Sequence, residues 1–70
     1  MDIIDRLYIS INKGDSRKNV LTQLGLLYLD YDNEVDVIIT ERLDYKHGTN
    51  CKRMYFRMKD DKVIQIDEAF

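Results

Sequence analysis

The stretch that decides the fold covers residues 20–45 and reads VLTQLGLLYLDYDNEVDVIITERLDY. Up to residue 31 its apolar side chains recur every three or four positions, which is the period of an α-helix with one buried stripe. From Val35 onward the period changes to two, which is typical of a β-strand that buries one face. The switch near residue 34 therefore predicts a helix followed by a strand, and the neighbouring segments extend the pattern in both directions.

A first amphipathic helix is predicted over about residues 2–13. Asp2 is a good N-cap residue, and Gly14 is a natural stop. The apolar side chains that share one face of this helix are Ile3, Ile4, Leu7, Tyr8 and Ile11.

A second helix is predicted to begin after Asp15 or Ser16, either of which can cap it, and to continue to Tyr31. Its buried stripe consists of Val20, Leu21, Leu24, Leu27, Tyr28 and Tyr31. In an alternative interpretation the helix ends at Gly25 and residues 26–31 form a strand.

Three antiparallel strands are predicted after the switch, over about residues 35–45, 51–59 and 63–67. The side chains expected to face the core are Val35, Val37, Ile39, Leu43 and Tyr45 on the first strand and Met54, Phe56 and Met58 on the second. A two-residue turn at Gly48-Thr49 would oppose Leu43 to Met54, Ile39 to Met58 and Asp44 to Arg53. On the third strand, Ile64 is expected to pair with Met58 and Ile66 with Phe56. The sequence thus predicts one small α+β domain over residues 1–70, with two N-terminal helices packed on a three-stranded antiparallel β-meander in two layers.

Residues that could carry chemistry are few. Cys51 is the single cysteine and His47 the single histidine, so neither an internal disulfide nor a usual zinc site can form. These two residues also lack the orienting group that a nucleophile and its base require. The alternating acids of residues 30–36 do not make a calcium loop, because Val35 stands where such a loop needs glycine. We therefore expect no enzymatic activity, no cofactor and no bound metal.

Length and charge suggest where such a protein works. The chain start lacks the features of a secretory signal, and no apolar run approaches the ~20 residues of a membrane span. A cytoplasmic protein without membrane association is expected. A net charge of −2 disfavours a general nucleic-acid binder.

Charge is nevertheless segregated along the predicted hairpin. Residues 30–44 carry six acids and one base, whereas residues 46–59 carry five bases and no acid. In the simplest interpretation these charges pair across the hairpin, each contributing well under ~1 kcal/mol. The alternative is a binding face for a nucleic acid or an acidic protein, with Lys46 and Lys52 near the turn. The residues expected to form it are Arg53, Tyr55, Arg57 and Lys59.

Three apolar residues fall outside the predicted core. Leu26 and Leu29 lie on the far side of the second helix, and Ile9 lies on the far side of the first. Such residues can be scattered on any surface, but together they would form a protein interface. The first functional hypothesis is therefore a small regulator, adaptor or inhibitor that binds a protein partner, with homodimerisation through the back of the second helix as a further expectation. Nucleic-acid binding through the basic strand is the second.

Overall fold

Two helices come first in the computed structural model, which describes residues 2–44 and 51–69. Helix α1 covers Ile3–Ser10 and helix α2 covers Arg17–Leu26. The first helix is shorter than the predicted 2–13, because the chain becomes extended at Ile11 with a φ of −126°. The second begins as expected: the Ser16 hydroxyl caps it by accepting a hydrogen bond from the Asn19 N–H at 3.1 Å.

The C-terminal end of α2 is a Schellman motif. The Leu29 N–H donates to the Leu24 carbonyl at 3.1 Å, and the Tyr28 N–H donates to the Gly25 carbonyl at 3.0 Å. Tyr28 takes the left-handed conformation that this motif requires, with a φ of 56°. Helix α2 therefore ends at Leu26, five residues before the predicted end at Tyr31 and one residue after the alternative end at Gly25. The strand of that alternative, over residues 26–31, is wrong except at Tyr31, where β1 begins.

The sheet is antiparallel throughout and is built around the nine-residue strand β4 (Cys51–Lys59). On one side β4 pairs with β5 (Lys62–Ala69), and on the other side with β2 (Val37–Thr40) and β3 (Leu43–Asp44). Strand β1 (Tyr31–Asn33) pairs with β2 at the opposite edge from β5. The predicted α+β class is confirmed. In the described residues the predicted three strands become five, because β1 was not foreseen and the expected 35–45 strand is interrupted after Thr40.

The side chains of β2 that face the core are the opposite set from the one predicted. Ile38 and Thr40 are buried, whereas Val37 and Ile39 are only half-buried and Val35 is 85% exposed. Residues 41 and 42 lie outside the strands, and Leu43 is buried after them, as predicted.

The predicted hairpin register is also wrong. Leu43 pairs with Lys52 instead of Met54, and Ile39 pairs with Tyr55 instead of Met58. Asp44 pairs with Cys51 instead of Arg53. The prediction is off by two residues along β3 and by three along β2. The one-residue difference between the two strands arises at residues 41 and 42, where two residues between Thr40 and Leu43 stand against one of β4, as in a bulge. The expected turn at Gly48-Thr49, like Tyr45 and Lys46, lies outside the described residues.

Strands β4 and β5 come closest to the prediction. Met54, Phe56 and Met58 are all buried, and Phe56 pairs with Ile66 as expected. Met58 pairs with Val63 instead of Ile64, because a bulge shifts the register between Arg57 and Met58. The turn between the strands is Asp60-Asp61, with φ angles of 52° and 59°, as a two-residue type I′ turn requires.

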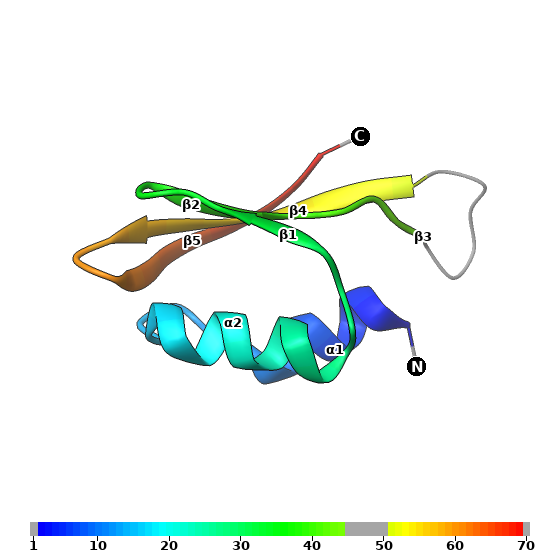
Figure 1. The fold of residues 1–70 in the computed structure, drawn as a ribbon, viewed down its shortest axis with the longest axis horizontal. Coiled ribbons are helices and arrows are strands. Elements are labelled where there is room, and N and C mark those ends of the chain that lie inside the picture. Colours follow the sequence, from blue (N-terminus) through cyan, green and yellow to red (C-terminus); the bar gives the residue numbers. More distant parts are fainter. Residues whose placement is uncertain (1, 45–50, 70) are drawn as a thin grey trace.

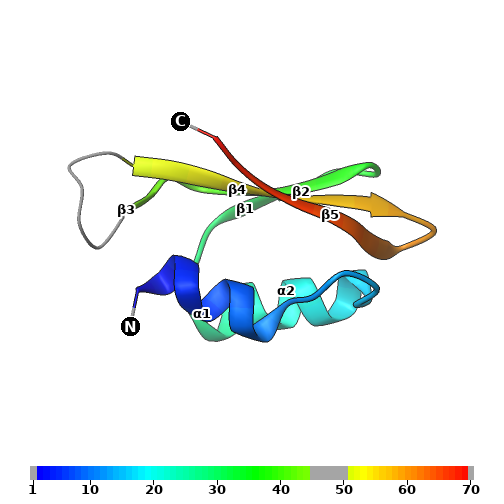
Figure 2. The ribbon, with the colours of Figure 1, turned by 180° about the vertical axis from the view of Figure 1, so that it is seen from behind.

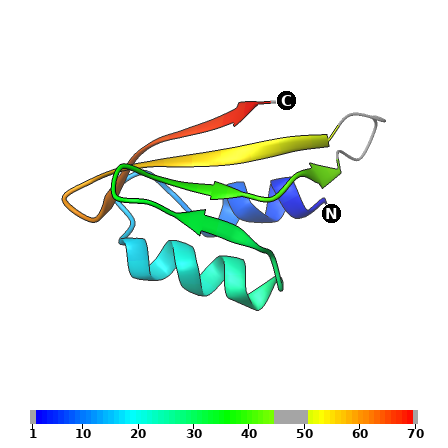
Figure 3. The ribbon, with the colours of Figure 1, turned by 45° about the horizontal axis from the view of Figure 1, so that its top comes forward.

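Both helices lie on one face of the sheet, as Figures 1 and 2 show from opposite sides. Helix α1 runs under the β5 side and α2 under the β1 side, and Figure 3 shows the sheet above both helices. The buried apolar core between them consists of Ile4, Leu7, Ile11, Val20, Leu24, Leu29, Ile38, Leu43, Met54, Phe56, Met58 and Val63. Within residues 2–44 and 51–69, no helix covers the other face of the sheet.

Candidate functional site

Tyr28 combines two features that stability alone does not favour. Its φ of 56° is a conformation that glycine adopts freely and that strains a residue with a Cβ by about 1–2 kcal/mol. Its side chain is 94% exposed, so burial offsets almost none of this strain. Strained residues of this kind are concentrated at functional sites.

Leu26 lies two residues before Tyr28 and is 67% exposed. It borders a shallow depression of about 280 Å³ between the two helices, to which Arg6, Ser10 and Gln23 also contribute. We call the exposed side chains of Leu26 and Tyr28 the Tyr28 surface.

The other two residues of the predicted protein interface have different positions. Ile9 is 65% exposed on α1, next to Ser10 of the same depression. Leu29 is only 9% exposed and belongs to the core, so its predicted place on the surface is wrong. The Schellman turn is the reason: the reversal at Tyr28 directs the next side chain back against Leu24. A hydrophobic contact between these two positions commonly accompanies the motif.

Carboxylates follow the Tyr28 surface along the chain. Asp30, Asp32 and Glu41 line a depression of about 400 Å³ together with Arg42 and Arg53. The Asp30 and Glu41 segments are joined by a backbone hydrogen bond of 3.0 Å from the Glu41 N–H to the Asp30 carbonyl. This end of the sheet thus brings Asp32 of β1, Asp30 just before β1 and Glu41 just after β2 close to the start of β4.

Two arginines of the predicted anionic-partner face lie close to carboxylates of their own chain. Arg57 forms an ion pair of 2.9 Å with Asp67 of β5, which also accepts a hydrogen bond from Gln65. These hydrogen bonds lower the pKa of the Asp67 carboxyl below its ordinary value of 3.8. Arg53 lines the acidic depression, Tyr55 is half-buried between them, and Lys59 is exposed near the Asp60-Asp61 turn. Lys52 projects to the other face, where its ammonium lies 4.0 Å from Glu68.

Cys51 begins β4, and its thiol donates a 2.9 Å hydrogen bond to Asp44. This bond to a carboxylate raises the pKa of the thiol above 9.0, so little of the reactive thiolate forms near neutral pH. His47 lies outside the described residues. Within residues 2–44 and 51–69, no cluster of three or more His, Cys, Asp or Glu side chains could hold a metal ion.

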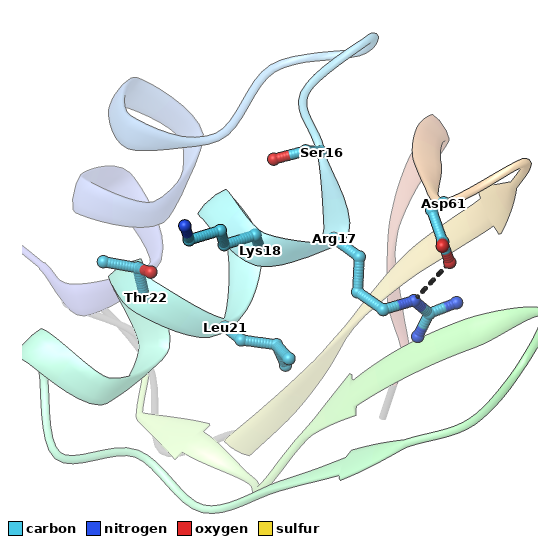
Figure 4. Close-up of a pocket in the computed structure, with 6 residues that line it drawn as sticks. All are labelled: Ser16, Arg17, Lys18, Leu21, Thr22 and Asp61. Atoms are coloured by element: carbon cyan, nitrogen blue, oxygen red, sulfur yellow. Dashed lines mark hydrogen bonds and ion pairs between the residues drawn. The ribbon is translucent and has the colours of Figure 1, made fainter.

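Arg17 is a residue whose role the sequence did not reveal. It lies at the start of α2 beside a depression of about 580 Å³ that Ser16, Lys18, Leu21, Thr22 and Asp61 also line (Figure 4). Its guanidinium forms a 2.9 Å ion pair with Asp61, bonds the Asn33 side chain, and donates to the Glu34 and Val35 carbonyls at 2.8 and 2.6 Å. These bonds tie α2 to the β1–β2 turn and the β4–β5 turn, so Arg17 holds the fold together and is not available to a ligand.

The sequence also did not indicate directly that the Tyr28 side chain is exposed. The helical period places it in the core stripe, and no glycine marks the left-handed position at the helix end. The available signal was indirect: the apolar run of residues 26–29 is too wide for one buried stripe, so one of its members had to be exposed.

Comparison of the chain with models of protein families, with curated proteins and with solved structures found no match. In the described part of the chain, neither helix has the length and apolar character that crossing a bilayer demands. The site is therefore interpreted from its own residues.

Proposed function

We propose that this chain is a small non-enzymatic binding module that acts through protein–protein contacts as a regulator, adaptor or inhibitor, and that the Tyr28 surface is its principal contact. The observation that carries the proposal is a fully exposed tyrosine in a backbone position suited to glycine. A residue that costs stability and packs against almost nothing in its own chain is retained for another reason. Contact with a partner supplies that reason.

The chemistry of the surface suits a protein partner. Tyrosine gives a large contact area with only two side-chain torsions to order, and it is enriched at interfaces. Leu26 adds an exposed apolar neighbour. Asp30 and Asp32 follow within four residues, so the partner is expected to present an apolar pocket with a basic rim.

The proposal is tested by capture with immobilised protein from cells that make it naturally. Partner recovery should fall at least tenfold with Tyr28→Ala and with Leu26→Asp. Val35→Ala is the matched control, because Val35 is an equally exposed apolar residue at the β1–β2 turn, at the other end of the molecule (Figure 1). Circular dichroism checks that each variant is folded. Equal recovery of the partner by the original protein and the three variants would show that the Tyr28 surface is not the contact.

A second candidate function, nucleic-acid binding, is favoured by one observation: Arg53, Tyr55 and Arg57 alternate along β4 on the face of the sheet without helices. Alternating guanidinium and aromatic groups can combine phosphate contacts with base stacking. The ion pair between Arg57 and Asp67 and the acids around Arg53 weaken this surface for a polyanion.

Titration with single- and double-stranded oligonucleotides at two salt concentrations tests this second function. Binding that weakens steeply with salt and is lost in Arg53→Glu/Arg57→Glu, but not in Lys18→Glu on α2, would support it. Absence of binding at low salt would exclude nucleic-acid binding through this face of β4.

A further inference from the structure

The end of α2 follows the residue spacing of its Schellman motif closely. Leu24 accepts the closing hydrogen bond, Tyr28 is the left-handed residue four positions later, and Leu29 follows directly. Leu24 and Leu29 both belong to the buried core. This end is therefore held by its apolar pair, against the conformational preference of the tyrosine between them.

The same spacing occurs one turn earlier in the helix. Leu21, Gly25 and Leu26 are related to one another as the apolar, left-handed and apolar residues of a second Schellman motif. Leu26 is exposed, and Leu21 is only half-buried beside the depression of about 580 Å³ shown in Figure 4. A helix that ended through Gly25 would place Leu26 against Leu21, as the apolar contact of the motif requires.

Gly25 does nothing in the observed helix end that requires glycine. It lies inside the helix and has no positive φ. Among the described residues, a Cβ added to it would meet nothing within 4 Å beyond its chain neighbours and the backbone of its own turn. Glycine inside a helix is less favourable than alanine, because it loses more backbone entropy. An end through Gly25 would remove two penalties, since the glycine would become left-handed and Tyr28 would not.

We propose that α2 exchanges between two ends. In the major end, which the structure shows, the helix continues to Leu26 and Tyr28 is left-handed. In the minor end Gly25 is left-handed, and residues 26–30 leave the helix. The major end predominates because it buries Leu29 in the core and keeps one more turn of helical hydrogen bonds. The minor end is accessible because it relieves the strain at Tyr28 and covers Leu26.

The exchange controls the Tyr28 surface. In the minor end Leu26 turns toward Leu21 and Tyr28 lies outside the helix end, so the two side chains no longer form one surface. A partner that binds this surface therefore favours the major end, and the exchange sets the fraction of protein that is ready to bind. This consequence rests on the proposed function, whereas the exchange is a property of the chain alone and is tested without a partner.

Amide hydrogen exchange of the full chain distinguishes the two ends. The Leu27 N–H donates to the Gln23 carbonyl at 3.3 Å, and the Leu29 N–H closes the Schellman motif at 3.1 Å. Both bonds are absent from the minor end. The Leu26 N–H is bonded in both ends, to the Leu21 carbonyl in the minor one. The Leu27 and Leu29 amides should therefore exchange faster than the Leu26 amide.

Gly25→Thr and Gly25→Asn form a matched pair of variants. Threonine and asparagine have similar helix propensities, but only asparagine adopts the left-handed conformation readily. The space around Gly25 accepts either side chain without displacing a neighbour. A left-handed residue with a Cβ is disfavoured by a factor of roughly 5–30, so Gly25→Thr should raise the protection of the Leu27 and Leu29 amides by that factor. Gly25→Asn should raise it less.

Two results would overturn the proposal. Equal protection in Gly25→Thr and Gly25→Asn would show that the opening does not need a left-handed residue at position 25 and is ordinary fraying of the helix end. Exchange of the Leu27 and Leu29 amides at the same rate as the buried Val20 amide would show that this segment opens only when the whole protein unfolds. Neither result bears on whether Tyr28 contacts a partner, because no partner is present in these measurements.

Discussion

Replacing Tyr28 with glycine should stabilise the fold, although it removes a large side chain. The left-handed backbone strains a non-glycine residue by about 1–2 kcal/mol, and glycine removes that strain. Glycine also increases the conformational entropy of the unfolded chain, which offsets about 0.5–1 kcal/mol. Because the tyrosine is 94% exposed, almost no buried area is lost. The free energy of unfolding should therefore rise by about 0.75 kcal/mol at the middle of these two ranges, within limits of about 0 and 1.5 kcal/mol.

For a domain of this size such a gain raises the melting temperature by about 2–8 °C. Tyr28→Ala is the matched control, because alanine removes the aromatic ring but keeps the strain, so its stability should stay within about 0.5 kcal/mol of the original. Thermal and urea unfolding measure all three proteins. If Tyr28→Gly is less stable than Tyr28→Ala, the backbone at this position is not strained, and the main reason for assigning Tyr28 to a binding surface disappears.

Three further predictions concern the core and the ion pairs of the fold. Arg17→Leu should lower the free energy of unfolding by about 1–3 kcal/mol, because the charged hydrogen bonds to two turns are lost, whereas Lys18→Leu should change it by less than about 0.5 kcal/mol in the same urea titration. Leu29→Ala should cost about 2–5 kcal/mol and Leu26→Ala almost nothing, since the first residue is in the core and the second on the surface; equal effects would contradict this assignment. Asp67 has a lowered pKa in the folded protein, so its contribution to stability is complete above its ordinary pKa of 3.8 and is lost as the pH falls through the lower folded value. An NMR titration of its carboxyl carbon should give a midpoint below 3.8 that moves upward in Arg57→Gln.

The sequence predicted the fold well where the alternation of apolar and polar residues allows only one assignment of the buried face. In β4, three large apolar residues alternate with charged or aromatic ones, and the buried set of Met54, Phe56 and Met58 follows directly. In β2 the adjacent Ile38 and Ile39 are both apolar, so alternation alone does not say which of them faces the core. The deciding residue is Thr40, which is buried because its hydroxyl accepts a hydrogen bond from the Met54 N–H at 3.0 Å. That pairing depends on the register and is not visible in hydropathy.

The candidate site was harder to predict than the fold, because it depends on a single turn. The helical period placed Tyr28 in the core stripe and Leu26 and Leu29 on the far side of the helix, and the placements of Tyr28 and Leu29 are wrong. A Schellman motif closed by tyrosine instead of glycine exchanges Tyr28 and Leu29 between core and surface. Tyr28, which defines the candidate site, is therefore also the residue that departs from the usual sequence of a Schellman motif, where glycine is expected.

Site-specific photo-crosslinking tests the central claim, that the protein binds a partner through the end of α2. The photoreactive amino acid p-benzoylphenylalanine replaces Tyr28 in one protein and Val35 in another, and both are irradiated in cells that make the protein naturally. A partner bound at the end of α2 should give a covalent adduct of one discrete mass from position 28 and none of that mass from position 35. No adduct from position 28, or the same adduct from both positions, would contradict this claim.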